Sequence, residues 1–128
     1  MIEGVNLQKL YGDTQLFNGL NFKIEDGEYV CFSGASGTGK STLLNMIGQI
    51  EPISDGTILF DGKQINDKKS TKAFFGERVG FVFQNFALID NKTVRENLEL
   101  IPLKNRTGLS IKDALMTVGL KDKLNSMV

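Results

Sequence analysis

Short apolar runs separated by polar turns dominate the first half of the chain and predict β-strands. Residues 1–11 and 20–24 carry strand-forming side chains at spaced positions, as half-buried strands do. Residues 28–33 and 79–83 are apolar at most positions, which is typical of strands covered on both faces of a sheet. The pattern therefore predicts a β-rich first half with two buried strands in one sheet.

Pairs of Gly and Asp mark the turns between these runs. An Asp-Gly pair between two apolar runs predicts a tight hairpin, because both residues tolerate the positive φ that such turns require. Antiparallel pairing on both sides of residue 34 would differ from a plain alternation of strands and helices. Residues 66–70 are polar and are expected to form an exposed connection. The turn pairs are Gly12-Asp13, Asp26-Gly27, Asp55-Gly56 and Asp61-Gly62.

Helical spacing appears in three places. Apolar residues at positions 43, 44, 46 and 47 recur at helical spacing, and Gly48 follows them as a stop. Thr93 and Glu96 have the spacing of a capping box, which predicts a helix to about residue 100. Ser110 opens a third helix of the same form, and Gly119 ends it.

Composition limits the classes of function. The 128 residues make one domain or part of a larger one, and 41% of them are hydrophobic, which predicts a packed core. The 15 basic and 15 acidic residues cancel, so neither nucleic-acid binding nor a polybasic membrane anchor is favoured. No run has the length of a transmembrane helix, and no signal peptide is evident. Cys31 is expected to be a small buried core residue, and histidine, the commonest general base, is absent.

Nine consecutive residues form the candidate phosphate site, and they lie between a predicted strand and a predicted helix. Their first eight fit G-x-x-x-x-G-K-[ST], although a glycine-rich surface turn is the alternative. Glycines allow successive N–H groups to surround phosphate oxygens, and Lys40 would reach the β- and γ-phosphates. Ser41 would supply a hydroxyl ligand to Mg²⁺, and Thr42 would donate to the α-phosphate. The residues are Gly34, Ala35, Ser36, Gly37, Thr38, Gly39, Lys40, Ser41 and Thr42.

The order of three features resembles the ATP-binding domain of ABC transporters. These are Tyr11 in the N-terminal β region, the string GASGTGKST, and the segment FVFQNFALIDNKTVRENLEL. The last segment resembles bacteriocin exporters of the lactococcin kind. The resemblance implies an α/β fold of the ABC-type P-loop NTPases, with an antiparallel β region, a P-loop strand-helix core and the start of a helical subdomain. It places the ATP-binding core in residues 1–84 and the helical part in residues 85–128.

The resemblance also assigns roles to single residues, with ATP and Mg²⁺ as cofactors. Tyr11 would stack on adenine beside Leu16, although a tyrosine that is only half buried in a strand is the alternative. Gln84 would reach Mg²⁺ and the attacking water, although it could merely end a strand. Lys40 and Gln84 are the expected catalytic residues of this chain, and Ser41 and Gln84 the metal ligands.

The resemblance further implies protein partners. Residues 85–98 would meet a transmembrane permease subunit, which would hold the protein at the inner, cytoplasmic face of the membrane. A second nucleotide-binding domain would complete a head-to-tail dimer. The LSGGQ signature, the Walker B strand, the D-loop and the switch histidine are absent from these residues. We therefore expect the N-terminal portion of such a domain, unable to hydrolyse ATP alone and prone to self-association through exposed sheet edges.

Two other classes remain open. A complete small P-loop kinase or GTPase is one, but Val94 stands where a guanine-reading carboxylate would be needed in Asn91-Lys92-Thr93-Val94. A noncatalytic interaction module that keeps the P-loop as architecture is the other. A GTPase would discriminate sharply between bases, whereas an ABC ATPase would favour ATP with more tolerance. Nucleotide binding that survives Lys40→Ala would favour the noncatalytic module.

Overall fold

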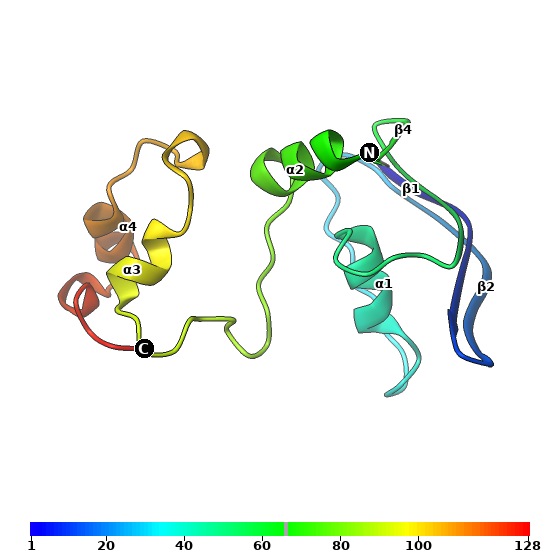
Figure 1. The fold of residues 1–128 in the computed structure, drawn as a ribbon, viewed down its shortest axis with the longest axis horizontal. Helices are drawn as coiled ribbons and strands as arrows, with labels where there is room; N and C mark the ends of the chain where they lie inside the picture. Colours follow the sequence, from blue (N-terminus) through cyan, green and yellow to red (C-terminus); the bar gives the residue numbers. More distant parts are fainter. Residues whose placement is uncertain (66) are drawn as a thin grey trace. The chain divides into compact units, whose positions relative to one another are not determined.

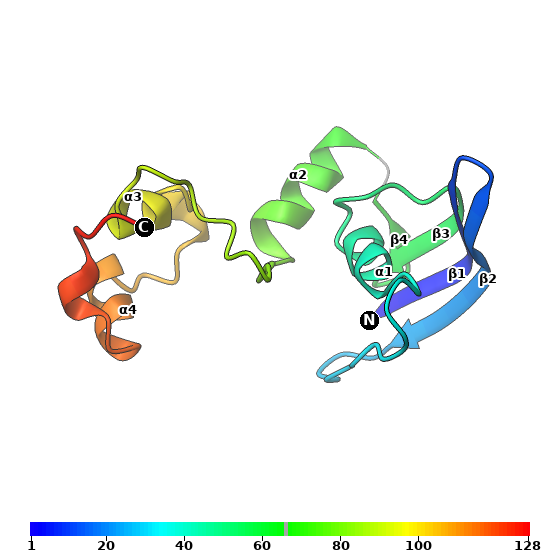
Figure 2. The same ribbon diagram turned by 90° about the horizontal axis from the view of Figure 1, so that it is seen from below.

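The computed structural model describes residues 1–65 and 67–128, and these form two compact units. The first unit comprises Met1–Val79 and the second Gly80–Val128. Each unit has its own helices, and the strands belong to the first (Figures 1 and 2). The predicted limit between core and helical part, at residues 84–85, remains a prediction.

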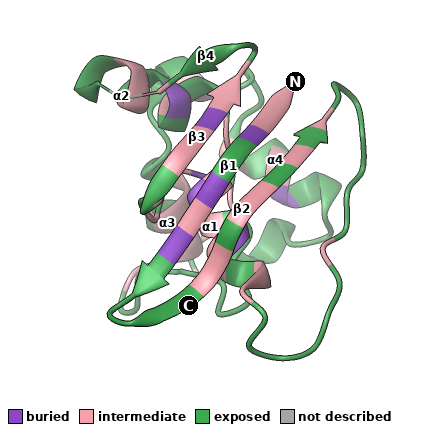
Figure 3. Cartoon of the chain, turned by 90° about the vertical axis from the view of Figure 1, so that its right-hand side faces the viewer, coloured by how far each residue is buried: buried purple, intermediate pink, exposed green. Residues whose placement is uncertain are grey.

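An antiparallel sheet forms the first unit, with β1 at its centre. The strand order is β2-β1-β3-β4, and all neighbours run antiparallel. Buried positions lie along β1 and β3 (Figure 3). The strands are β1 (Ile2–Tyr11), β2 (Thr14–Ile24), β3 (Asp55–Phe60) and β4 (Lys63–Gln64).

Two of the four predicted turns join paired strands. Gly12 and Asp13 link Tyr11 to its partner Thr14, as predicted. Asp61 and Gly62 connect β3 to β4 with φ angles of 51° and 73°, the conformation of a type I′ hairpin. The other two hairpin predictions were wrong: residues 26–27 turn without a strand after them, and residues 55–56 begin β3 itself.

Helix α1 (Lys40–Ile47) forms where the apolar spacing predicted a helix, and it covers one face of this sheet (Figure 2). Its Leu43 and Met46 pack with Leu7 of β1 and Ile58 of β3 in a buried cluster. Met46 and Leu7 have no exposed surface. The helix ends at Gly48, whose amide donates to the Leu44 carbonyl at 2.8 Å. This packing anchors the helix that follows the phosphate-loop sequence.

The predicted strand at residues 28–33 is not formed. Among the described residues, no segment exchanges ladder hydrogen bonds with residues 29–33, and a strand needs such a neighbour. Phe32 nevertheless packs against the buried cluster of the sheet and α1. The adjacent Cys31 is exposed, so the expected burial of Cys31 was wrong.

The exposed connection predicted at residues 66–70 is wrong for its last residues, because a helix begins at Lys68. Asp67 caps α2 (Lys68–Glu77): its carboxylate accepts from the amides of Lys69 and Ser70 at 2.8 and 3.0 Å. Residue 66, also assigned to the connection, lies outside the described residues. Phe74 of α2 is buried, and its ring centroid lies 4.5 Å from that of Phe60. Phe74 is thus the buried apolar residue of α2, and it packs this helix against β3.

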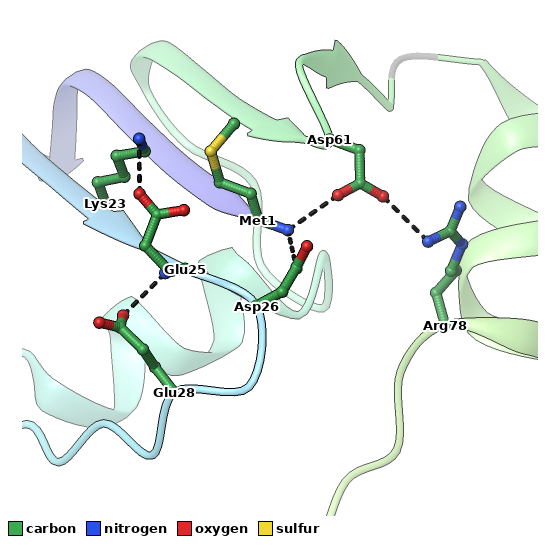
Figure 4. Close-up of polar contacts among 7 residues, drawn as sticks. All are labelled: Met1, Lys23, Glu25, Asp26, Glu28, Asp61 and Arg78. Atoms are coloured by element: carbon green, nitrogen blue, oxygen red, sulfur yellow. Dashed lines mark hydrogen bonds and ion pairs between the residues drawn. The ribbon is translucent and has the colours of Figure 1, made fainter.

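Charged groups join the ends of these elements at the surface (Figure 4). The amino group of Met1 contacts the carboxylates of Asp26 and Asp61. Arg78, at the end of α2, donates to Asp61 at 3.0 Å. The Met1 amine, followed by Arg78, lowers the pKa of the Asp61 carboxyl.

The second unit consists of short helices and connecting loops. Its buried apolar residue among those described is Leu115 of α4. The C-terminal segment closes on α3, where the amides of Val94 and Arg95 donate to the carbonyls of Ser126 and Leu124, each at 2.9 Å. The helices are α3 (Val94–Glu99), η1 (Leu103–Asn105), α4 (Ile111–Thr117) and η2 (Lys121–Lys123).

The predicted caps of α3 and α4 are confirmed. Thr93 accepts from the Glu96 amide at 3.2 Å, and Glu96 accepts from the Thr93 amide at 2.7 Å. Ser110 accepts from the amide of Asp113 at 3.1 Å. Gly119, with φ of 75°, ends α4 as the sequence indicated.

The buried strand predicted at residues 79–83 is wrong. None of the described residues pairs with this segment in a ladder, and the Val82 side chain is fully exposed. The rings of Phe81 and Phe83 stack on each other with centroids 5.5 Å apart. Without a neighbouring strand, an apolar run gains no ladder hydrogen bonds and does not become a strand.

None of the helices within residues 1–65 and 67–128 combines the length and apolarity that crossing a bilayer requires.

Candidate nucleotide-binding site

The phosphate-loop sequence forms an exposed loop that enters α1 at Gly39. Gly39 has φ of 92°, a left-handed conformation that costs any other residue free energy. A Cβ atom at this position would lie 2.7 Å from Cζ of Phe17 and 2.9 Å from Cδ2 of Leu16. Position 39 therefore accepts only glycine without displacement, and the loop approaches β2 closely.

The backbone amides of this loop are available to a ligand. Among the described residues, none accepts a hydrogen bond from the amides of residues 36–42. The first amides of a helix have no partner within it, and the helix dipole makes this end positive. The loop residues 34–38 are exposed. This arrangement suits an anion with several oxygen atoms, such as a polyphosphate.

Lys40 adds a mobile positive charge to the same place. Its Nζ donates to the carbonyls of Gly34 and Ala35 at 3.0 and 2.7 Å, so the ammonium lies against the loop. The Thr38 hydroxyl also donates to the Ala35 carbonyl, at 2.9 Å. Phosphate oxygens would replace these carbonyls as partners of the lysine.

Two hydroxyls stand in the first turn of α1, next to the unpaired amides. Ser41 is exposed and Thr42 is half buried. A hydroxyl oxygen beside a bound triphosphate is a suitable Mg²⁺ ligand, because this ion takes oxygen donors and keeps several waters. The residues present therefore fit the magnesium nucleotide expected from the sequence.

Tyr11 lies at the same end of the sheet as the loop. It pairs with Thr14 across the hairpin, and Leu16, two residues further along β2, meets Gly39. Two residues of strand span roughly 7 Å. The structure thus places Tyr11 and Leu16 at the loop end of β1 and β2, although their contact with a base stays a prediction.

Two residues that the sequence reasoning missed hold Tyr11 in place. Nζ of Lys9 lies 4.7 Å from the centroid of the Tyr11 ring, and the Tyr11 hydroxyl contacts the Glu51 carboxylate. Lys9 and Glu51 also pair with each other at 2.8 Å. Lys9, followed by the Tyr11 hydroxyl, lowers the pKa of the Glu51 carboxyl. Lys9 and Tyr11 are two residues apart in a predicted strand, and this spacing could have indicated that their side chains share one face.

Gln84 belongs to the second unit and is exposed in a turn. Its predicted role at Mg²⁺ and water therefore remains a prediction. Apolar side chains follow it, with Phe86 80% exposed. The predicted permease surface, residues 85–98, begins with these side chains.

The known proteins that this chain resembles are ATP-binding proteins of transport systems. A family model described as ABC transporter matches residues 17–128. The glutamine transport ATP-binding protein GlnQ of Bacillus subtilis is 42% identical over 104 residues, which are 81% of this chain and 43% of that protein. The bacitracin export ATP-binding protein BceA of Halalkalibacterium halodurans is 37% identical over 109 residues, covering 80% of this chain and 43% of that protein. The lipoprotein-releasing system ATP-binding protein LolD of Leptospira interrogans is 37% identical over 131 residues, covering 97% and 55%.

A solved structure supports the same assignment. A dimeric ATP-binding cassette in a post-hydrolysis state, bound to ADP and Pi, matches with a TM-score of 0.81 at 30% identity. The match covers 99% of this chain and 61% of that chain. The chain spans about half the length of the curated relatives it matches. With an ABC-type P-loop fold and a family model that matches residues 17–128, the chain belongs to the ABC transporter family.

Proposed function

We propose that this chain binds ATP with Mg²⁺ as part of the ATPase subunit of an ABC transporter. The observation that carries the proposal is the loop before α1, where the amides of residues 36–42 have no acceptor among the described residues and the Lys40 ammonium lies against the carbonyls of Gly34 and Ala35. A polyphosphate satisfies both at once. Tyr11 at the same end of the sheet supplies an aromatic surface for the base.

Each residue then has a physical task. The loop amides and Lys40 bind the β- and γ-phosphates, and the Thr42 hydroxyl and amide meet the α-phosphate. Bound Mg²⁺ would neutralise phosphate charge, with Ser41 as one ligand and Gln84 as a second. Tyr11 stacks on the adenine, and Leu16 contacts its edge.

Hydrolysis and assembly are proposed for the complete subunit. A second nucleotide-binding domain pairs with it head to tail, and the dimeric cassette among its structural relatives supports this. A permease subunit contacts residues 85–98 and holds the ATPase at the cytoplasmic face of the membrane. By itself the chain is proposed to bind nucleotide with little turnover and to self-associate.

We further propose that the cargo is exported, as a bacteriocin or another peptide. The support is the segment from Phe81 to Leu100, which resembles bacteriocin exporters, together with the similarity to a bacitracin export protein. A relative named for glutamine transport has a higher identity, 42%, and one named for lipoprotein release has the same identity, 37%. If the cargo is an exported peptide, deletion of the gene should retain that peptide inside the producing cells. Unchanged secretion would overturn the export proposal and leave the ATP-binding proposal standing.

Calorimetric titration of MgATP tests the binding proposal. We expect saturable binding that weakens at least tenfold in Lys40→Ala and in Tyr11→Ala. Lys72→Ala removes an exposed lysine of α2 and serves as the matched control. Equal binding by Lys40→Ala, or no binding by folded wild type, would overturn the proposal. Sharp preference for GTP would favour a GTPase instead.

A further inference from the structure

Lys9 is a lysine held almost completely inside the first unit, with 6% of its surface exposed. Buried lysines need partners, because removal of the ammonium from water is costly. Lys9 has two: its Nζ lies 2.8 Å from Oε1 of Glu51 and donates to the Pro52 carbonyl at 2.8 Å. The ammonium is therefore fixed in one place beside the Tyr11 ring.

Tyr11 is restrained at two points by this pair. Its hydroxyl contacts Oε1 of Glu51, the same oxygen that faces Lys9. Nζ of Lys9 lies 4.7 Å from the ring centroid, on one face of the ring. A hydroxyl contact and a cation at one face together define the plane of an aromatic ring. Half of the Tyr11 surface remains exposed for a ligand.

Glu51 is in turn attached to the helix of the phosphate loop. The amides of Ile50 and Glu51 both donate to the Asn45 carbonyl of α1, at 2.9 and 3.2 Å. Asn45 lies near the end of the helix that the phosphate loop begins. The contacts from Asn45 through Glu51 to Tyr11 therefore connect the aromatic ring with the phosphate-binding helix.

We propose that Lys9 and Glu51 are positioning residues that hold the Tyr11 ring ready for a purine base, at a fixed place relative to the phosphate loop. This inference rests on the proposed function. A restrained ring loses less rotamer freedom on binding, so affinity rises without a new contact to the nucleotide. The Lys9 cation on one face also leaves the opposite face for the base.

A purely structural role of the ion pair makes a different prediction. If Lys9 and Glu51 only stabilised the fold, their loss would affect every ligand of the site alike. A positioning role affects ligands that carry a base and spares those that do not. Magnesium tripolyphosphate has the phosphates of ATP without the base, so it separates the two roles.

The first experiment titrates MgATP and magnesium tripolyphosphate into the whole chain by calorimetry. Tyr11→Phe keeps the ring and removes the Glu51 contact, and Glu51→Gln weakens the link to Lys9. We expect each variant to lose roughly threefold to tenfold in ATP affinity and to keep its tripolyphosphate affinity. The double variant should lose no more than the worse single variant, because both changes break one restraint. Tyr29→Phe, at a fully exposed tyrosine, is the control.

Fluorescence gives a second readout that needs no ligand. The chain has 2 tyrosines and no tryptophan, so in Tyr29→Phe all emission comes from Tyr11. Adding Glu51→Gln or Lys9→Met should lower the anisotropy of that emission, because the ring rotates more freely. Circular dichroism confirms that these variants are folded.

The outcomes are distinct. Equal losses for ATP and tripolyphosphate, unchanged ATP affinity in Glu51→Gln, or unchanged Tyr11 anisotropy would each overturn the positioning role while the proposed function stands. Wild type that binds neither ligand would overturn the proposed function, and the positioning role with it.

Discussion

Replacement of Gly39 by alanine should destabilise the first unit more than any other glycine change in the phosphate loop. Two costs combine at this position. The left-handed backbone, at φ of 92°, costs an alanine roughly 1–2 kcal/mol. The new Cβ atom would lie 2.7 Å from Cζ of Phe17, and such overpacking typically costs about 1–3 kcal/mol.

Phe17 cannot move away without further loss, because its ring packs against the buried cluster of Leu7, Leu43, Met46 and Ile58. The sum predicts a decrease of about 2–5 kcal/mol in the free energy of unfolding. Urea denaturation followed by circular dichroism measures it. ATP binding should fall as well, since the loop has to move away from β2.

Two other glycines provide matched controls. Gly37 has φ of 81°, but a Cβ there would meet nothing within 4 Å. Gly37→Ala therefore carries only the backbone cost of roughly 1–2 kcal/mol. Gly80 has neither positive φ nor a neighbour within 4 Å, so Gly80→Ala should change little. If Gly39→Ala proved no worse than Gly37→Ala, the reasoning about close approach to Phe17 would be refuted.

Three further predictions concern the core and a helix cap. Met46→Ala should lower the free energy of unfolding by about 2–5 kcal/mol, because Met46 is fully buried. Leu44→Ala, at a half-exposed site on α1, should lower it by less than about 1 kcal/mol. Denaturant titration of both variants measures the difference. Thr93→Ala should lower the stability of α3 by about 1 kcal/mol, seen as faster hydrogen exchange of its amides, and unchanged exchange would argue against the cap. The Thr93 amide and hydroxyl lower the pKa of the Glu96 carboxyl. The contribution of the ionised Glu96 to the stability of α3 is therefore complete above the ordinary glutamate pKa of about 4.3, and it is lost as pH falls through the lowered pKa. The NMR shift of the Thr93 amide should titrate with a midpoint below about 4.3, and Glu96→Gln should abolish this titration.

Local chemistry made several elements readable from the sequence. The caps at Thr93 and Ser110 are bonds between residues three apart, and the structure forms both. The turn at Asp61 and Gly62 depends on which residues tolerate positive φ, and it appears as expected. In each case one short stretch contains both the group that needs a partner and the partner.

Helix α2 shows where local signals were present but misread. Asp67 and Ser70 form its capping box, yet the polar stretch predicted a connection. Its apolar contact is provided chiefly by Phe74 against Phe60 of β3. A helix fixed by one distant aromatic residue lacks the apolar periodicity on which sequence reasoning depends.

The sequence by itself determined the phosphate loop, the helix after it, the helices capped by Thr93 and Ser110, and the turns at residues 12–13 and 61–62, since these follow from backbone preferences and neighbouring side chains. Only the tertiary structure decided that residues 28–33 and 79–83 pair with no other strand in the described part of the chain and that Cys31 is exposed. It alone brought Lys9 to Glu51, which lies far along the chain from it. Strand pairing and buried ion pairs need a partner from elsewhere in the chain, and no local pattern specifies which segment will supply it.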